Sequence, residues 1–352
     1  MRKFQPVKIS SREKYPGVDF TAIINIKIKH REIALKLKSG WKWLLAIAAI
    51  LLAALLVQYL VSNLLNIETQ QLDQESKRSA PGEFLLLPAG EVHYRLAGPN
   101  DAPLVVLVHG FSVPSYVWDP TFSALEEAGY QVLAFDLFGR GYSERPQGNY
   151  DIDLFTKQLD DLLTALEIDE PVVLSGLSMG GPIVARFART HPERVSGVIL
   201  IAPEVIQTTP GDIFPLNVPL LGEFLMGAVM EPFVLPRLQA ADFVHPERYP
   251  DWEAQYRVQL QYKGTGKALL STIRNLTEQD PEEEYQALEE TGIPLLLIWG
   301  EEDQTISRDH IEILGQLMPK MQVEVVPDAG HLPHYEQDEI VDPLIINFLN
   351  AR

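Results

Sequence analysis

A serine enclosed by glycines lies where an apolar run gives way to a helical pattern. In the stretch VVLSGLSMGGPIVARF, residues 172–187, Gly176, Ser178 and Gly180 form the spacing G-x-S-x-G. This spacing occurs in ordinary tight turns and in nucleophile elbows, where a strained strand-to-helix turn exposes a serine hydroxyl. It arises by chance in roughly one chain in ten of this length. Ser178 is therefore a candidate nucleophile that needs support from the rest of the chain.

Two further polar residues follow apolar runs in the same way. Asp303 comes shortly after PLLLIWG, and His331 comes shortly after MQVEVVPD. In open α/β sheets, ligands bind at the carboxyl ends of the strands, so residues that follow strands meet at one edge of the sheet. The chain order Ser, Asp, His matches that of a known class of catalytic triads. We therefore expect Ser178, Asp303 and His331 to come together.

Each of these side chains would have its own chemical task. A serine hydroxyl is a poor nucleophile at neutral pH, so a base must take its proton as it attacks a carbonyl. His331 is the predicted base, because an imidazole with a pKa of about 6.5 can accept that proton and return it to a leaving group. Asp303 is the predicted acid that orients the imidazole and stabilises the imidazolium ion.

Two other residues compete for the tasks of base and acid. His334 has local surroundings similar to those of His331, and the two could suggest a metal site, but no third ligand is evident nearby. Glu204 follows the run VSGVILIAP and is the alternative to Asp303. We prefer His331 and Asp303, and we expect no metal.

Three other polar residues are predicted to have structural roles. Asp136 ends an apolar run and is expected to organise a turn, and His109 is expected to brace a loop. His93 has no convergent partner in the sequence, so we interpret it as an ordinary surface or satisfied histidine.

Short β-rich runs alternate with helical patterns after residue 83. Residues 84–87 and 92–96 predict a β-hairpin. Continuous apolar runs, typical of strands buried on both faces of a parallel sheet, occupy residues 104–110, 131–136, 171–176, 195–203, 294–300 and 321–328. Helical patterns occupy residues 115–128, 153–167, 179–190, 307–317 and 343–351. The alternation predicts an α/β fold with a mostly parallel sheet and helices on both faces. Residues 204–290 are Pro-rich and helical without a convincing strand, and predict a helical cap insertion.

Motifs across residues 83–350 resemble those of the α/β-hydrolase superfamily. They are HGFS (109–112), DLFGRGYS (136–143), GLSMGG (176–181), WGEEDQ (299–304) and GHLPHYEQ (330–337). They are most similar to capped serine hydrolases such as monoacylglycerol lipases and bacterial esterases. The resemblance implies the α/β-hydrolase fold and cleavage of carboxylic esters through an acyl-enzyme.

The resemblance also implies an oxyanion hole formed by the backbone N–H groups of Phe111 and Met179. Gly110 would let the loop that contains Phe111 approach the turn at Ser178 closely. Epoxide hydrolases and haloalkane dehalogenases share the fold but need a carboxylate where Ser178 stands. Lactonase, C–C bond hydrolase and cofactor-free perhydrolase chemistry remain alternatives on the same residues. A catalytically silent binding module is the alternative outside the enzymes. No cofactor is implied.

The charge distribution excludes some partners. The chain of 352 residues has a net charge of −19, although residues 1–42 hold eleven Lys and Arg against three acidic residues. The remaining acidic surface disfavours nucleic acid as a partner, because phosphate binding needs a basic surface. The absence of cysteine excludes disulfides and thiol catalysis.

Residues 43–67 contain no charged side chain and predict a single transmembrane helix. The basic residues that precede it would keep the N-terminus in the cytoplasm and place the hydrolase domain on the extracytoplasmic side. Such an anchor would make the lipid bilayer a partner. It also favours acylglycerols or other lipid-like esters as substrates over small soluble esters.

The segments around the expected span complete the predicted organisation. Residues 1–42 form a basic tail, whose first 40 residues predict either a hairpin or an amphipathic segment on anionic lipid. Residues 68–82 are polar, end in Pro-Gly and predict a flexible linker. Residues 83–352 would form the hydrolase domain, with the cap at 204–290.

Overall fold

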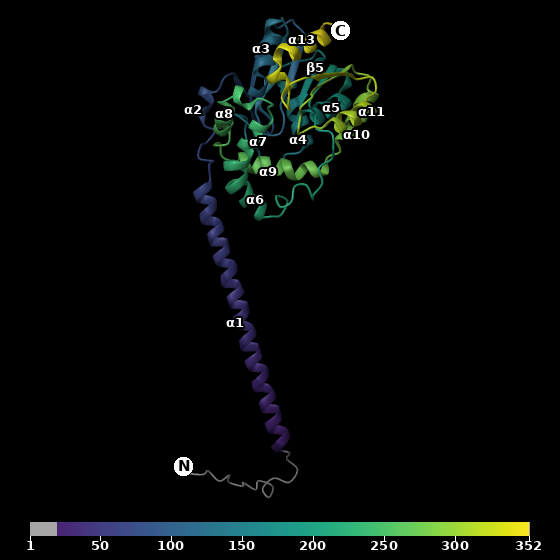
Figure 1. Ribbon diagram of the computed structural model, residues 1–352. Helices are drawn as coiled ribbons and strands as arrows, with labels where there is room; N and C mark the ends of the chain where they lie inside the picture. Colours follow the sequence, from purple (N-terminus) through teal and green to yellow (C-terminus); the bar gives the residue numbers. More distant parts are fainter. Residues whose placement is uncertain (1–19, 352) are drawn as a thin grey trace. The chain divides into compact units, whose positions relative to one another are not determined.

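The computed structural model describes residues 20–351, except for the side chains of residues 20, 23–24, 34–40, 51 and 54–55. The chain divides into two compact units, one that ends at Val61 and one that begins at Ser62. The described part of the first unit is helical and belongs to α1 (Phe20–Leu65). The second unit contains the sheet and the helices around it (Figure 1).

Eight strands form one sheet in the order β1-β2-β4-β3-β5-β6-β7-β8. Their bounds are β1 (Glu83–Leu87), β2 (Gly90–Ala97), β3 (Leu104–Val108), β4 (Gln131–Phe135), β5 (Val172–Leu177), β6 (Val195–Ile201), β7 (Leu295–Gly300) and β8 (Gln322–Val326). Strand β2 pairs antiparallel with β1 and β4, and the other neighbouring strands are parallel. The predicted hairpin and mostly parallel sheet are confirmed.

The helices of the second unit alternate with these strands. The α-helices are α2 (Gln74–Ser79), α3 (Asp119–Glu127), α4 (Ile152–Ala165), α5 (Gly180–Thr190), α6 (Leu221–Leu225), α7 (Leu235–Ala241), α8 (Trp252–Gln259), α9 (Thr265–Asn275), α10 (Pro281–Glu290), α11 (Arg308–Leu317), α12 (Pro333–Glu336) and α13 (Asp338–Asn350). Short 3-10 turns are η1 (Ser115–Trp118), η2 (Pro192–Arg194), η4 (Pro246–Arg248) and η5 (Leu276–Glu278), and η3 (Met226–Val234) is π-helical.

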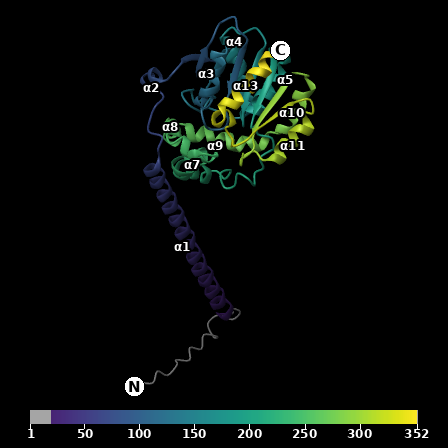
Figure 2. The same cartoon turned by 45° about the horizontal axis from the view of Figure 1, so that its top comes forward.

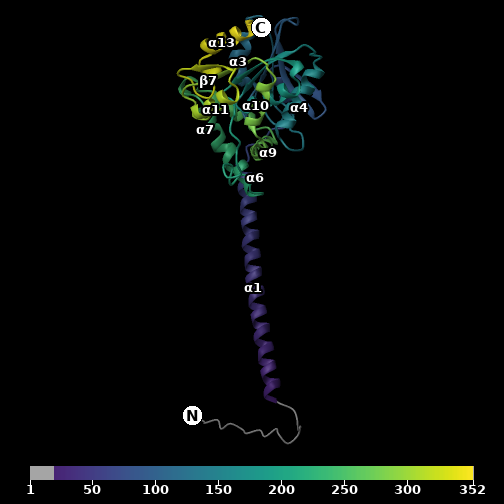
Figure 3. The ribbon, with the colours of Figure 1, turned by 90° about the vertical axis from the view of Figure 1, so that its right-hand side faces the viewer.

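The central strands are buried on both faces, which explains why their sequences are continuous apolar runs. All five residues of β3 are buried. Val106 and Val108 join a core cluster with residues of α4, α5, α10 and α11, whereas Val105 and Leu107 join another with residues of α3 and α13. This division follows from the alternation of side chains along a strand. Figures 2 and 3 show the two groups of helices from other directions.

The segment between β6 and β7 forms the helical insertion. Helices α6, α7, α8 and α9 gather at one end of the second unit in Figure 1, coloured green. Within the described chain this segment contains helices and no strand of the sheet. Helix α10 differs from the others, because it packs against α5 beside the sheet.

The expected membrane span at residues 43–67 is not supported. Helix α1 begins at Phe20, so these apolar residues share one helix with a preceding basic stretch that includes Lys27 and Arg31. No helix in the described part of the chain is both long and apolar enough to cross a membrane. The expectation of a single-pass protein with a cytoplasmic N-terminus and an extracytoplasmic domain is therefore wrong. A bilayer partner is also unsupported.

Of the two expectations for the N-terminal tail, the structure tests only the hairpin, and the amphipathic segment on anionic lipid stays a prediction. A hairpin is wrong for residues 20–40, because these residues are helical in α1. The backbone of a helix satisfies its hydrogen bonds locally, so no second strand is needed there. The rest of the tail, residues 1–19, lies outside the described residues.

Residues 68–82 contact the cap instead of forming a free coil. Both carboxylate oxygens of Glu68 accept hydrogen bonds from backbone N–H groups, from Gly264 at 2.9 Å and from Gly266 at 2.7 Å. These N–H groups belong to the beginning of α9, where unpaired donors and the helix dipole favour an anion. Gln70 also forms a backbone bridge with Tyr262.

Glu231 lies buried beneath this contact. Its side chain is 3% exposed. Gly266 makes room for it, because a Cβ at that position would overlap the Glu231 carboxyl group. Burial, followed by the charge and hydrogen bond of Glu68, raises the pKa of Glu231 to about 9. Glu231 is therefore protonated at neutral pH.

This pair predicts a pH-dependent stability that Glu231→Gln removes. The pKa is about 9 in the folded state, against an ordinary value of 4.5, so the folded chain holds a proton that the unfolded chain has lost between these pH values. The contribution of Glu231 to stability is fully present below pH 4.5 and is lost as pH rises toward 9. Between pH 6.5 and 8.5, we expect the wild type to lose about 1–3 kcal/mol relative to the glutamine variant. Urea unfolding at both pH values measures the difference, and parallel curves would contradict the prediction.

Candidate active site

Ser178 occupies a strained turn between β5 and α5. Its φ is 51°, in the left-handed region that non-glycine residues rarely adopt. The Ser178 N–H donates to Ile201 on β6 at 3.0 Å, and its carbonyl accepts from Gly181 at 2.8 Å. A Cβ at Gly176 would lie 2.5 Å from the Gly180 carbonyl oxygen, so the turn needs glycine there. These contacts hold the serine at the carboxyl end of the sheet.

His331 and Asp303 meet after the ends of β8 and β7. Nδ1 of His331 lies 3.0 Å from Oδ2 of Asp303, and both residues are buried. The other oxygen of Asp303 accepts from the backbone N–H groups of Thr305 at 2.7 Å and Ile306 at 2.9 Å. These bonds fix the carboxylate, which then accepts from the Nδ1–H of His331 and leaves its Nε2 as a proton acceptor.

Opposing effects set the pKa of His331. Burial alone would lower this pKa, but the hydrogen bond and charge of Asp303, together with the charge of Asp242, raise it above its ordinary value. An imidazolium ion is therefore stabilised at this position, which a general base needs once it has taken a proton.

Ser178 and His331 line the same pocket, which has a volume of about 390 Å³. The remaining lining comes from the segment after β3, from the end of β5, from α7 and the residue after it, from the loop after β7 and from the loop before α12. These residues are Gly110, Phe111, Ser112, Val113, Val117, Leu177, Leu238, Gln239, Ala241, Asp242, Gln304, Thr305 and Leu332. Two of the three predicted catalytic residues, Ser178 and His331, thus line one pocket between the sheet and the cap, and Asp303 contacts His331.

The two predicted oxyanion donors lie beside this serine. Phe111 lines the pocket, and Met179 follows Ser178 directly at the beginning of α5. Within residues 20–351, neither backbone N–H donates to another protein group. A Cβ on Gly110 would be 3.1 Å from the Cβ of Ser178, so glycine permits this close approach. Both N–H groups are free to bind an oxyanion.

A buried arginine holds the loop of Phe111. Nε of Arg140 donates to the Phe111 carbonyl at 2.8 Å, and Nη2 donates to Thr272 on α9 at 2.9 Å. No carboxylate in the described part of the chain forms an ion pair with it. Burial lowers the pKa of Arg140 to about 9, so it stays a cation at neutral pH. The arginine thus joins the loop of Phe111 to the cap.

The competing residues have other partners. Nε2 of His334 lies 3.1 Å from the Val117 carbonyl, and burial lowers the pKa of His334 to about 3. Glu204 forms no ion pair with His331 in the described structure. Burial raises the pKa of Glu204 to about 7. The geometry therefore favours His331 and Asp303 over these alternatives.

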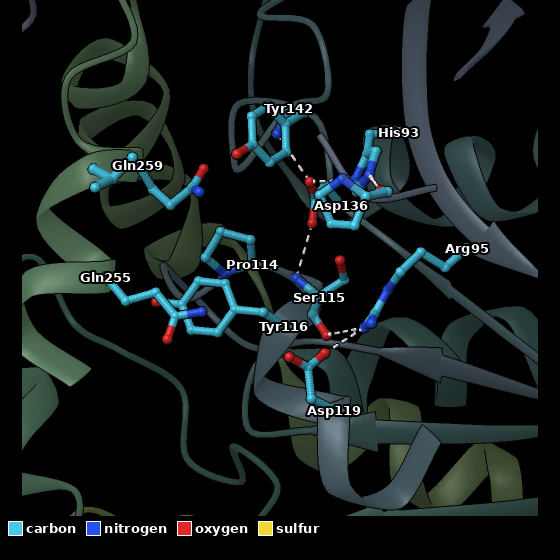
Figure 4. Close-up of a pocket in the computed structure, with 12 residues that line it drawn as sticks. His93, Arg95, Pro114, Ser115, Tyr116, Asp119, Asp136, Tyr142, Gln255 and Gln259 are labelled. Atoms are coloured by element: carbon cyan, nitrogen blue, oxygen red, sulfur yellow. Dashed lines mark hydrogen bonds and ion pairs between the residues drawn. The ribbon is translucent and has the colours of Figure 1, made fainter. Parts of the chain in front are cut away.

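The sequence analysis missed a buried pair behind the oxyanion loop. Nδ1 of His93 lies 2.8 Å from Oδ2 of Asp136, and both side chains are buried. Oδ1 of Asp136 accepts from Ser115 at 2.8 Å, which holds the loop after β3 (Figure 4). His93 is thus more than an isolated histidine. A signal existed, because a histidine inside an apolar hairpin strand, next to a strand that ends in aspartate, indicates a buried pair.

The same pair borders a second pocket of about 240 Å³ on the other side of this loop. Figure 4 shows Gln255 and Gln259 extending from α8 toward the side of the pocket where Ser115 and Asp136 lie. Asp136 therefore supports a loop whose residues 110–113 line the serine pocket and whose residues 114–116 line the second pocket.

Comparison with known proteins identifies relatives with the same architecture. A family model described as alpha/beta hydrolase fold matches residues 103–338. The AB hydrolase superfamily protein YfhM of Bacillus subtilis is 28% identical over 285 residues, 73% of this chain and 94% of the relative. The carboxylesterase YbfK of the same organism is 26% identical over 263 residues, 74% and 84% of the two chains. The structure of the enol-lactonase from Burkholderia xenovorans LB400 is similar to this chain, with a TM-score of 0.66 and 23% sequence identity. The match covers 76% of this chain and all of the enol-lactonase chain.

The geometry predicts that Asp303→Asn lowers the pKa of His331. The amide oxygen can still accept hydrogen bonds from the N–H groups of Thr305 and Ile306. The amide carries no negative charge, however, so it no longer offsets the lowering of the His331 pKa by burial. We expect a decrease of at least about one pKa unit, measured by NMR titration of the histidine rings. Glu204→Gln is the matched control, and an equal decrease in that variant would contradict the preference for Asp303.

Proposed function

Because this chain belongs to the alpha/beta hydrolase fold family, we propose that it is a serine hydrolase of carboxylic esters. Ser178 is the nucleophile, His331 the general base and acid, and Asp303 the residue that orients it. The observation that supports this most is the 3.0 Å contact between His331 and Asp303 beside the pocket that Ser178 lines. The carboxylesterase relative is consistent with the same class of substrate.

Acylation begins when the hydroxyl of Ser178 attacks the ester carbonyl. Nε2 of His331 takes the hydroxyl proton, and the imidazolium is stabilised by Asp303. The tetrahedral intermediate then collapses, the bond to the alcohol oxygen breaks, and His331 gives its proton to that oxygen. Water repeats these steps on the acyl-enzyme and releases the carboxylic acid with the serine restored.

The negative charge of the intermediate is stabilised by the N–H groups of Phe111 and Met179. Such donors are preorganised, so they cost no reorganisation as the charge develops. Arg140 supports this step indirectly, because it holds the carbonyl of Phe111. The strained φ of Ser178 keeps the hydroxyl exposed beside the donors.

The pocket favours esters with an apolar acyl chain. Its lining includes Val113, Val117, Leu238 and Leu332. Acylglycerols and other lipid-like esters fit this lining, and the preference rests on the pocket and not on the N-terminal helix. A lactone is a cyclic ester, so the same groups would open one by the same steps.

A covalent probe tests the nucleophile. A fluorophosphonate should label the protein, and Ser178→Ala should abolish the labelling. Ser175→Ala is the matched control, because this buried serine lies on the same strand and should leave the labelling unchanged. Labelling that persists in Ser178→Ala would mean that another serine is the nucleophile.

Steady-state kinetics on a 4-nitrophenyl ester tests the acid. Asp303→Asn should lower kcat about 10³–10⁴-fold, because the amide donates to Nδ1 and holds the imidazole in the wrong tautomer. Glu204→Gln should change kcat less than about threefold, since the ion-pair partner of His331 in the described structure is Asp303 and not Glu204. A larger loss in Glu204→Gln than in Asp303→Asn would move the acid to the strand before the cap.

A further inference from the structure

The cap places one carboxyl group in the pocket of Ser178. Asp242 follows α7 directly and lines this pocket together with Ser178 and His331. It also lines an adjoining pocket of about 210 Å³, which shares Gln304 and Thr305 with the first. Asp242 thus lies where the two pockets meet.

The backbone fixes the position of Asp242. Its carbonyl accepts a hydrogen bond from the N–H of His331 at 2.9 Å. A Cβ at Gly330 would lie 2.5 Å from the same carbonyl oxygen, so the close contact requires glycine. The cap residue and the catalytic histidine are therefore held together by the main chain and not by a mobile side chain.

The charges around the pocket are one-sided. Among its lining residues in the described chain, His331 and Asp242 are the only ionisable side chains, and none is lysine or arginine. Burial raises the pKa of Asp242 to about 6, with the charge of His331 acting in the opposite direction. Asp303 and Glu336 also raise it, whereas a hydrogen bond from Thr305 lowers it. Asp242 is consequently an anion at pH 8.

From this arrangement we infer that Asp242 restricts the enzyme to esters without a negative charge near the scissile bond. An anionic substrate would bring its carboxylate into a partly buried pocket that holds a like charge and no lysine or arginine. An uncharged acyl chain meets the apolar lining without that penalty. This inference rests on the proposed ester hydrolysis and names its substrate class as uncharged esters.

Two substrates of equal chain length test it. 4-Nitrophenyl butyrate is neutral, and the mono-4-nitrophenyl ester of succinic acid carries a carboxylate at the end of the same four-carbon chain. The measured quantity is kcat/KM for butyrate divided by kcat/KM for the succinate ester. At pH 8 this ratio should be at least about tenfold higher in the wild type than in Asp242→Asn. The asparagine keeps the volume and the bond from Thr305 but removes the charge.

Glu302→Gln is the matched control for long-range charge. Glu302 is exposed and lines only the adjoining pocket, so the ratio of the two kcat/KM values should stay within about twofold of the wild type. A ratio in Asp242→Asn that equals the wild-type ratio would overturn the inference. An equal change in Glu302→Gln would also overturn it, because a general field would then explain the selectivity.

The pH dependence of the wild type provides a measurement that needs no variant. Asp242 loses its charge as pH falls through about 6, so the preference for butyrate should decrease between pH 8 and 5.5. The decrease should be smaller in Asp242→Asn, where only His331 of the pocket still titrates. A preference that stays constant in the wild type would contradict the inference. If the wild type hydrolyses neither ester, or Ser178→Ala still hydrolyses them, the proposed function itself fails and the inference fails with it.

Discussion

The close approach of two loops at the carboxyl end of the sheet is the constraint on which the site depends. The parallel pairing of β3 with β5 brings Gly110 against Ser178, and the absence of a side chain on Gly110 lets the two loops approach closely. The same pairing places Gly180 against the carbonyl of Val108, where a Cβ would overlap it. The strained backbone of Ser178 persists because these contacts and its own hydrogen bonds over-determine it. The proposed nucleophile and oxyanion donors are thus positioned by main-chain geometry.

Buried charges keep this geometry rigid. Asp136 binds His93 and the backbone of Ser115, and Arg140 binds the carbonyl of Phe111. Each group is removed from water, so losing a partner would leave an unsatisfied charge in a region of low dielectric constant. These interactions hold the loop of Phe111 on one side, while its residues 110–113 line the pocket of Ser178 on the other. His331, the proposed general base, is held similarly, through Asp303 and the carbonyl of Asp242.

The cap contributes residues to the pocket and to the contacts around it. It supplies Asp242 to the pocket, Thr272 to Arg140 and the N-terminus of α9 to Glu68. The segment before β1 is therefore bonded to the same insertion that closes the pocket. Acidic groups recur at these junctions, and their raised pKa values follow from burial in each case. Such groups make the contacts sensitive to pH in a way that depends on tertiary packing.

The sequence by itself determined the parallel sheet, because apolar runs such as LVVLV are stable only when both faces are covered. Its glycine spacing also located the turn at Ser178, since a tight strand-to-helix turn leaves no room for side chains. Only the tertiary structure decided which acid reaches His331, which histidine bonds Val117, and how Asp242 enters the pocket. These contacts join residues far apart in the chain, so local patterns do not contain them. The apolar stretch at 43–67 suggested a membrane span, but no helix in the described part of the chain is long and apolar enough to be one.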